Sequence, residues 1–456
     1  MNKSAEDSRE ASNTASMRFP LHIPRLDSLE ALYGREKAAS QRARYEDLEK
    51  RYRKHFPSGS DASRLLFFSA PGRTELCGNH TDHNQGNVLA AAIDLDTVAA
   101  AAPRLDTRVR LVSEGFSAFE LDISDLGARS EERGSSEAIV RGMAAGIADF
   151  AKSAARRGPR PSPLKGFDAY VESDVLPGSG LSSSAAFELL IGGIIATFSG
   201  IDLSPMELAS IGQFSENVYF GKPSGLMDQM ACALGNIALI GFGAPSKASV
   251  ELLSFAPGDY GLSLVIAATG GSHADLTEEY AAIPAEMKAV AALFDKASLS
   301  DLASGELTAR AADIRRACGD RAFLRAWHFA HETLRPAALA VAIRERDIAS
   351  YLDIVKASGD SSAKYLQNLS PSTTPSTQGL MVAIALTEDF LGGEGACRVH
   401  GGGFAGTIQA YIPTPRLGEY ENLMESVFGL GTVFPLRIRP YGVVCIEIQK
   451  GALDER

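Results

Sequence analysis

The chain has little of what marks secreted, membrane-bound or nucleic-acid-binding proteins. Its five cysteines are scattered and odd in number, and none forms a C-x-x-C arrangement, which favours a reducing compartment over a disulfide framework. The most apolar stretch, residues 189–198, is far too short for a membrane span and predicts a buried helix. Acidic residues outnumber basic ones by 56 to 45, and the net charge of -11 argues against a surface for DNA or RNA. We therefore expect a cytoplasmic protein with neither a nucleic acid nor a membrane as its partner.

The length and the N-terminal composition predict how the chain is divided. A chain of 456 residues is too long for one ordinary core, so two domains are expected. Residues 1–20 are polar and lack an apolar core, which predicts a disordered tail and neither a signal peptide nor a transit peptide. After residue 245 the pattern changes to charged helices. We therefore expect an N-terminal domain over 21–245 and a C-terminal domain over 246–456.

A glycine- and serine-rich segment separates a predicted strand at 167–172 from the predicted buried helix. It reads PGSGLSSSAA over residues 177–186. Glycines let backbone N–H groups close on an anion, a helix N-terminus carries partial positive charge, and hydroxyls bond phosphate oxygens or a metal. The P-loop pattern G-x-x-x-x-G-K-[ST] is absent from the chain. The segment predicts either a phosphate-binding loop or a serine-capped helix start behind a glycine-rich turn.

A second segment, residues 69–89, reads SAPGRTELCGNHTDHNQGNVL and follows an apolar strand. Its density of Arg, Asn, His and Asp suits recognition of a polyol, because each sugar hydroxyl needs a directional donor or acceptor. A polar surface turn is an equally good account of this stretch alone. The pair His80 and His83 is a weak metal motif, because no Cys or further His lies at ligand spacing nearby.

Two further segments carry chemistry-bearing residues. Residues 221–230, GKPSGLMDQM, place Asp228 just inside a predicted helix, where an acid is also an ordinary capping group. Residues 395–406, GACRVHGGGFAG, have glycines that suggest close approach of the backbone to another group, or a plain glycine-rich hairpin.

Taken in this order, the four segments resemble the GHMP kinase superfamily and, within it, the galactokinases. GRTELCGNHTDHNQGNVL is similar to the galactokinase signature G-R-[VA]-N-[LI]-I-G-E-H-T-D-Y-N-x-G-x-V-L. The other three are similar to the nucleotide loop, the catalytic-Asp segment and the C-terminal glycine motif of the superfamily. The resemblance covers roughly residues 67–412. It implies a two-domain α+β fold, with a ribosomal-protein-S5-like N-terminal domain, a ferredoxin-like C-terminal domain and the active site in the cleft between them.

The resemblance also implies a reaction and its residues. ATP, with Mg²⁺, would phosphorylate the anomeric hydroxyl of galactose. Asp228 would take or orient the hydroxyl proton, and Arg73 would hold Asp228 ionised and stabilise charge on the phosphoryl group. The ATP phosphates would lie on the nucleotide loop, and Ser184 and Glu216 match the metal-associated hydroxyl and carboxylate. The loop residues are Pro177, Gly178, Ser179, Gly180, Leu181, Ser182, Ser183 and Ser184; the expected sugar contacts are Asn79, His80, Asp82, Gly225 and Tyr280.

The chain departs from the family pattern in the sugar segment. Asn79 replaces a Glu, so an amide stands where the signature has a carboxylate, and Glu75 replaces an Asn. His83 replaces a Tyr, His400 a Thr or Ser, and Ala405 a Gly. N-acetylgalactosamine and arabinose therefore remain alternative substrates.

A further alternative is a regulator that binds sugar and ATP without catalysis. The complete run of serines and alanines at 182–186, together with Asp228, favours an enzyme over that alternative. The sequence does not indicate the oligomeric state, and a monomer is consistent with it.

Overall fold

The computed structural model describes residues 24–26, 28–58, 60–155, 163–175, 178, 180–243, 248–270, 276–303 and 305–446. The polar tail predicted at 1–20, and Pro177 and Ser179 of the nucleotide loop, lie outside the described residues. Among the helices of the described ranges, none combines the length and the apolar character that crossing a membrane requires.

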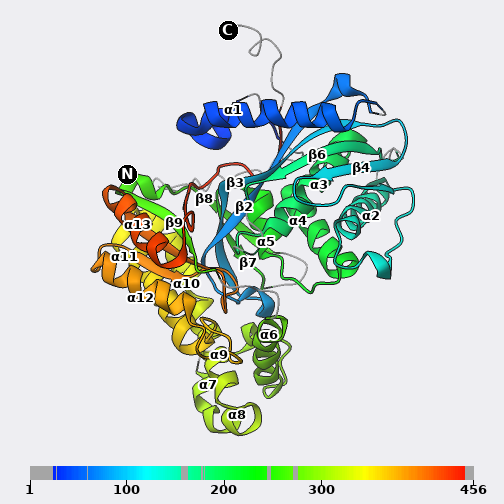
Figure 1. The fold of residues 1–456 in the computed structure, drawn as a ribbon. Coiled ribbons are helices and arrows are strands. Elements are labelled where there is room, and N and C mark those ends of the chain that lie inside the picture. The colour runs from blue at the N-terminus through cyan, green and yellow to red at the C-terminus, as the bar shows by residue number, and fades with distance from the viewer. Residues whose placement is uncertain are drawn as a thin grey trace, which may run out of the picture.

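The larger of two sheets carries the N-terminal half of the chain (Figure 1). Within the described residues its strand order is β1-β13-β2-β3-β6-β4-β5, and β7 and β8 extend it from β3. The strands β2 and β3 are antiparallel, whereas β4 and β6 are parallel. The strands are β1 (Arg25–Leu26), β2 (Leu66–Cys77), β3 (Asn87–Pro103), β4 (Arg108–Ser113), β5 (Phe119–Asp122), β6 (Phe167–Ser173), β7 (Ile237–Gly241), β8 (Ser249–Leu253) and β13 (Val444–Ile446).

Helices cover both faces of this sheet (Figure 1). Helix α1 packs on one face, against alternate residues of β2 and β3 such as Phe67 and Ala100. The helices α2 to α5 pack on the other face, where Phe68 and Ala101 point. Because β3 is buried on both sides, its small alanines let the helices approach closely. The helices are α1 (Leu29–His55), α2 (Ser136–Ala155), α3 (Ser183–Ser199), α4 (Pro205–Phe214) and α5 (Met227–Leu234).

Helix α3 contains the apolar stretch at 189–198, and the prediction of a buried helix there is confirmed. A helix that is apolar on all sides needs protein around its whole circumference. Here β2 and β3 lie on one side, and α2, α4 and α5 lie on the others. Its N-terminus is thereby fixed beside the end of β6 and the start of α5, where the nucleotide loop and Asp228 were predicted.

A smaller antiparallel sheet, β10-β11-β9-β12, organises the C-terminal half, with helices packed on it (Figure 1). Its strands are β9 (Leu262–Ala268), β10 (Ala396–Val399), β11 (Thr407–Pro413) and β12 (Val433–Leu436). The helices are α6 (Thr277–Ala292), α7 (Glu306–Ala309), α8 (Ala311–Cys318), α9 (Asp320–Glu332), α10 (Arg335–Glu345), α11 (Ile348–Ser361), α12 (Gly379–Leu391) and α13 (Leu417–Phe428).

The two halves are interleaved. The boundary expected near residue 245 falls between β7 and β8, which pair with each other in the larger sheet. The last strand, β13, also returns to pair with β2. The division into 21–245 and 246–456 stays a prediction.

Candidate active site

Arg73 and Asp228, the expected catalytic pair, are in contact. Arg73 on β2 donates from Nε to Asp228 Oδ1 at 2.8 Å, and its Nη2 lies 2.7 Å from the same oxygen. On the other side of the carboxylate, the Ser182 hydroxyl donates to Oδ2 at 2.6 Å. Burial raises the pKa of Asp228, but Arg73 and the Ser182 hydrogen bond outweigh it and hold that pKa below its ordinary value. The carboxylate is therefore ionised at neutral pH, and 34% of the side chain remains exposed to a ligand.

The nucleotide loop meets this pair through its backbone. Arg73 donates from its backbone N–H to the carbonyl oxygen of Leu181 at 3.0 Å, and from Nη1 to the carbonyl oxygen of Gly180. Ser182 has φ 62° and ψ 53°, a left-handed conformation that is strained for a residue with a side chain. Its hydroxyl does not cap α3 and bonds Asp228 instead. This backbone conformation directs the hydroxyl toward the carboxylate and away from the N–H groups of the first turn of α3.

Glu216 lies on a π-helical turn, Ser215–Phe220, which directly follows α4. Such turns are rare and often occur at functional sites. Glu216 Oε1 accepts from the Ser184 hydroxyl at 3.5 Å and from Lys222 Nζ at 2.9 Å, and Oε2 accepts from Gln229 Nε2 at 2.9 Å. The Lys222 side chain is 59% exposed, whereas that of Glu216 is 4% exposed. The expected metal residues Ser184 and Glu216 are thus neighbours, and an exposed cation stands beside them.

A second carboxylate, Glu188 on α3, completes this cluster. Gln229 Nε2 donates to Glu188 Oε2 at 3.0 Å as well as to Glu216. The other oxygen of Glu188 is buried and has no hydrogen-bond partner among the described residues. Burial first, and the neighbouring Glu216 second, raise the pKa of Glu188 well above its ordinary value. The charged form of Glu188 is therefore disfavoured, in contrast with that of Asp228. Sequence reasoning missed Glu188, Lys222 and Gln229; the one local signal was that Gln229 follows Asp228 directly.

The expected sugar residues come from separate elements. His80 Nε2 hydrogen-bonds the carbonyl oxygen of Gly402 at 2.9 Å, and the Tyr280 hydroxyl donates to that of Gly403 at 2.8 Å. Both side chains therefore attach to the glycine motif. Burial lowers the pKa of His80 to about 4, so the imidazole is neutral at pH 7.

Asp82 and Gly225 form the other part of the expected sugar site. They lie so close together that a Cβ built on Gly225 would be 1.9 Å from Asp82 Oδ2. Gly225 also belongs to the loop that leads into α5 and Asp228. This proximity links the segment after β2 with the loop that carries the catalytic carboxylate.

The Asn79 side chain is hydrogen-bonded to protein groups. Its side chain is fully buried, and Nδ2 donates to both carboxylate oxygens of Glu75, at 3.1 and 3.2 Å, and to Gly401 O at 2.7 Å. Its Oδ1 accepts from Asn368 Nδ2 at 2.8 Å. Protein groups thus occupy the amide of Asn79, and the expectation that Asn79 contacts the sugar stays a prediction. Sequence reasoning named Glu75 as a departure but missed Asn368, and also Arg398, which lies 2.6 Å from Glu75.

His400, another departure from the family pattern, packs against the nucleotide loop. Its ring nitrogens are 3.1 Å from the hydroxyl oxygens of Thr74 and of Thr407. A Cβ built on Gly180 would lie 3.2 Å from His400 Nδ1, so the imidazole packs directly on the loop. The glycine motif therefore contacts both expected ligand sites, the sugar segment and the nucleotide loop.

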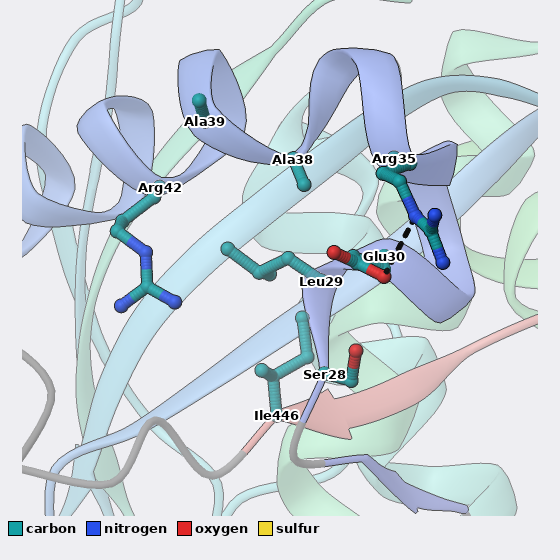
Figure 2. Close-up of a pocket in the computed structure, with 8 residues that line it drawn as sticks. All are labelled: Ser28, Leu29, Glu30, Arg35, Ala38, Ala39, Arg42 and Ile446. Atoms are coloured by element: carbon teal, nitrogen blue, oxygen red, sulfur yellow. Dashed lines mark ion pairs between the residues drawn. The ribbon is translucent and has the colours of Figure 1, made fainter.

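A surface cavity of about 400 Å³ lies away from these residues, beside the start of α1 (Figure 2). Its lining includes Leu29, Arg42 and Ile446, and an Arg35–Glu30 ion pair of 3.8 Å stands at its edge. None of the residues around Asp228 contributes to it. The convergence of charged groups, and not this hollow, therefore identifies the candidate active site.

Comparison with protein families finds two matching models. The galactokinase galactose-binding signature matches residues 50–103, which include Arg73 and the sugar segment. The GHMP kinases N-terminal domain matches residues 139–236, which include the nucleotide loop and Asp228. The two models thus cover three of the four segments recognised in the sequence.

Three curated relatives are all galactokinases, and two of them match over most of this chain. A galactokinase of Actinobacillus pleuropneumoniae serotype 3 is 29% identical over 372 residues, which are 81% of this chain and 90% of that protein. A galactokinase of Lactococcus lactis subsp. cremoris is 28% identical over 81% of this chain and 88% of its own length. A galactokinase of Lactobacillus helveticus is 34% identical over 227 residues, and there the match spans 49% of this chain and 55% of the relative.

Solved structures show the same fold. The Lactococcus lactis galactokinase crystallised with galactose has a TM-score of 0.72 and 24% identity, and the match covers 88% of this chain and 99% of that structure. The mevalonate kinase of Methanococcus jannaschii has a TM-score of 0.58 and 13% identity, with 83% and 99% covered. The expected GHMP kinase fold is confirmed.

Proposed function

Because the chain belongs to the galactokinase family of the GHMP kinases, we propose that it transfers the γ-phosphoryl group of ATP to the anomeric hydroxyl of galactose, which gives galactose 1-phosphate and ADP. The observation that carries this proposal is the Asp228 carboxylate, which is held ionised by Arg73 and Ser182 beside the nucleotide loop. Phosphoryl transfer needs this kind of arrangement, an aligned acceptor oxygen and nearby positive charge, and little covalent work from the protein.

Each group at Asp228 has a role in the transfer. The anomeric oxygen forms a bond to the γ-phosphorus, the bond from that phosphorus to the β–γ bridging oxygen breaks, and ADP leaves with the bonding electrons. Asp228 accepts the hydroxyl proton as the new bond forms. Arg73, whose Nη2 and Nε are within 2.8 Å of Asp228 Oδ1, keeps the base ionised and places positive charge beside the phosphoryl group. Ser182 fixes the orientation of the carboxylate.

The nucleotide loop supplies the phosphate site. We assign the ATP phosphates to the backbone N–H groups of 180–184 and of Gly178, at the positive end of α3. Gly178 and Gly180 have φ of 75° and 73°, which lets these N–H groups turn toward one centre. Pro177 and Ser179, which belong to the same proposed site, lie outside the described residues.

Ser184 and Glu216 fit Mg²⁺. The ion prefers hard oxygen ligands and is commonly held by one or two protein groups together with phosphates and water, which matches a hydroxyl and a carboxylate 3.5 Å apart. When bound, Mg²⁺ neutralises phosphate charge. The described residues contain no group of three carboxylate, His or Cys side chains suited to a metal, so ATP oxygens would complete the set. Lys222, 2.9 Å from Glu216 and mostly exposed, would add positive charge beside the phosphates.

The sugar lies between the segment after β2 and the loop before α5. We assign its hydroxyls to His80, Asp82 and Tyr280, with Gly225 leaving the space beside Asp82 open. Asn79 acts indirectly in this arrangement, by holding the glycine motif on which His80 and Tyr280 depend. The five cysteines are free thiols, four of them buried, which supports the cytoplasm as the site of action.

A substrate panel tests the proposal. Purified protein is supplied with ATP and Mg²⁺, and ADP release is measured with galactose, N-acetylgalactosamine, glucose and arabinose. We expect galactose to give the highest kcat/KM. If no sugar releases ADP although ATP binds, the chain is a non-catalytic sensor, and the proposed function is wrong. If N-acetylgalactosamine or arabinose outranks galactose, the chain is a kinase but the assigned substrate is wrong.

A further inference from the structure

Two departures from the galactokinase signature lie in direct contact. The signature has an amide at position 75 and a carboxylate at position 79, whereas this chain has Glu75 and Asn79. Asn79 Nδ2 donates to Oε1 and Oε2 of Glu75 at 3.1 and 3.2 Å. We propose that Glu75 and Asn79 are an exchanged carboxylate–amide pair whose hydrogen bonds position the sugar-binding segment. This inference rests on the proposed function.

The carboxylate in its new place is held by a buried cation. Glu75 is 2% exposed, and Oε1 accepts from Arg398 Nη2 at 2.6 Å. The Arg398 side chain is fully buried, and its Nε and Nη1 find no hydrogen-bond acceptor in the part of the chain that the structure describes. Within the described residues, Glu75 is thus the carboxylate that neutralises Arg398 by direct contact. A neutral side chain at position 75, without a carboxylate placed elsewhere to replace Glu75, would leave the buried charge of Arg398 unpaired.

The amide at position 79 donates hydrogen bonds that a carboxylate could not donate. Asn79 Nδ2 donates to Gly401 O at 2.7 Å, and Asn368, which donates to Asn79 Oδ1, also donates to Gly402 O at 3.1 Å. Gly402 O is the group that His80 bonds. A carboxylate at 79 would stand against Glu75 and against a carbonyl oxygen. Each residue of the pair therefore requires the other.

The exchange also changes the charge of the sugar segment. Residue 79 directly precedes His80, and with Asn79 fully buried no carboxylate oxygen at this position is available to a sugar hydroxyl. The segment is positioned by an amide whose hydrogen bonds are all internal. We therefore expect the pair to set the affinity for the sugar and not the affinity for ATP.

A double-mutant cycle tests the pair. The parent, Glu75→Asn, Asn79→Glu and the double exchange are compared in Tm, KM for galactose and KM for ATP. The control is Glu251→Gln, which breaks an exposed ion pair with Arg344 in which both side chains are 46% exposed. We expect each single variant to lower Tm and to raise the KM for galactose by about tenfold or more, with the KM for ATP within about twofold.

The double exchange decides the outcome. The amide introduced at position 75 would accept from Arg398 and donate to the carboxylate introduced at position 79, so we expect Tm to recover and the KM for galactose to return to within about threefold of the parent. Additive losses would overturn the proposal, as would singles that lose Tm but keep the KM for galactose. Insoluble singles with a soluble double support it, and an insoluble double refutes it. If the parent phosphorylates no sugar, the proposed function fails, while the Tm cycle still tests the pairing of the two residues.

Discussion

The sharpest test of the proposed chemistry is Asp228→Asn. This substitution removes the negative charge and the proton-accepting oxygen but keeps a side chain of the same shape. Its amide oxygen still accepts from Arg73, and its amide nitrogen donates to Ser182. The change therefore separates the role of the carboxylate as a base from its role in packing, which Asp228→Ala would mix because Arg73, 5% exposed, would lose its partner entirely.

The structure bounds both effects of Asp228→Asn. Loss of a general base lowers turnover by about 10²- to 10⁴-fold, or roughly 3–5 kcal/mol of activation free energy. The cost in folding free energy is smaller, about 1–3 kcal/mol, because hydrogen bonds to Arg73 and Ser182 are kept and a third of the side chain is exposed. Ser182→Ala, which removes one 2.6 Å hydrogen bond to the charged carboxylate, should cost only about tenfold in turnover.

A coupled assay of ADP formation, with saturating ATP and galactose, measures these rates at 15 °C, a temperature chosen so that the variants stay folded. A thermal melt reports their stability separately. We expect Asp228→Asn to reduce kcat far more than Ser182→Ala does, and to leave the KM for ATP nearly unchanged. Retention of more than a tenth of the parental kcat by a folded Asp228→Asn variant would remove Asp228 as the base. A loss confined to KM would make it a binding residue.

Three other predictions follow from the site. Burial lowers the pKa of His80 from 6.5 to about 4, so the unfolded chain binds a proton at a higher pH than the folded chain does, and Tm should fall as the pH drops from 6.5 to 4. His80→Gln should flatten that part of a curve of Tm against pH, and an unchanged curve would contradict the assignment. Glu188→Gln should keep kcat within about threefold because burial and Glu216 already disfavour the charge of Glu188. Glu216→Gln should instead raise the Mg²⁺ concentration needed for half-maximal rate by about tenfold, and equal effects would refute the distinction. Gly225→Ala sets a methyl group against Asp82 and should raise the KM for galactose, measured with the KM for ATP as its control.

Much of the site followed from the sequence through local pattern and resemblance. The glycine- and serine-rich segment marked the start of α3 because an apolar helix followed it directly. Arg73 and Asp228, 155 positions apart, were paired only through the resemblance, because no periodicity links a strand residue with the first turn of a distant helix. The contact of Ser182 with Asp228 depends on a left-handed backbone that a serine rarely adopts, which no propensity would predict.

Asn79 shows why residue type alone misleads. An amide in a segment rich in polar residues suggests a ligand contact, yet Asn79 is buried because α9, the π-helical turn Ser362–Leu366 and the glycine motif close over the end of β2. Arg398, which fixes the charge beside it, is 323 positions from Glu75. Burial in this region is decided by long-range packing, and the sequence offered only the departure from the signature at 75 and 79 as a clue.

The distribution of charge around Asp228 explains how an anionic substrate is accepted beside three acidic residues. Asp228 is paired with Arg73, and Glu216 is paired with Lys222, so two carboxylates meet two cations. The third acid, Glu188, has its pKa raised by burial and by Glu216, which disfavours its charged form. The cluster therefore opposes the phosphates less than three free carboxylates would. The two carboxyl groups differ because Asp228 is 34% exposed beside a guanidinium, whereas Glu188 is completely buried beside a second acid.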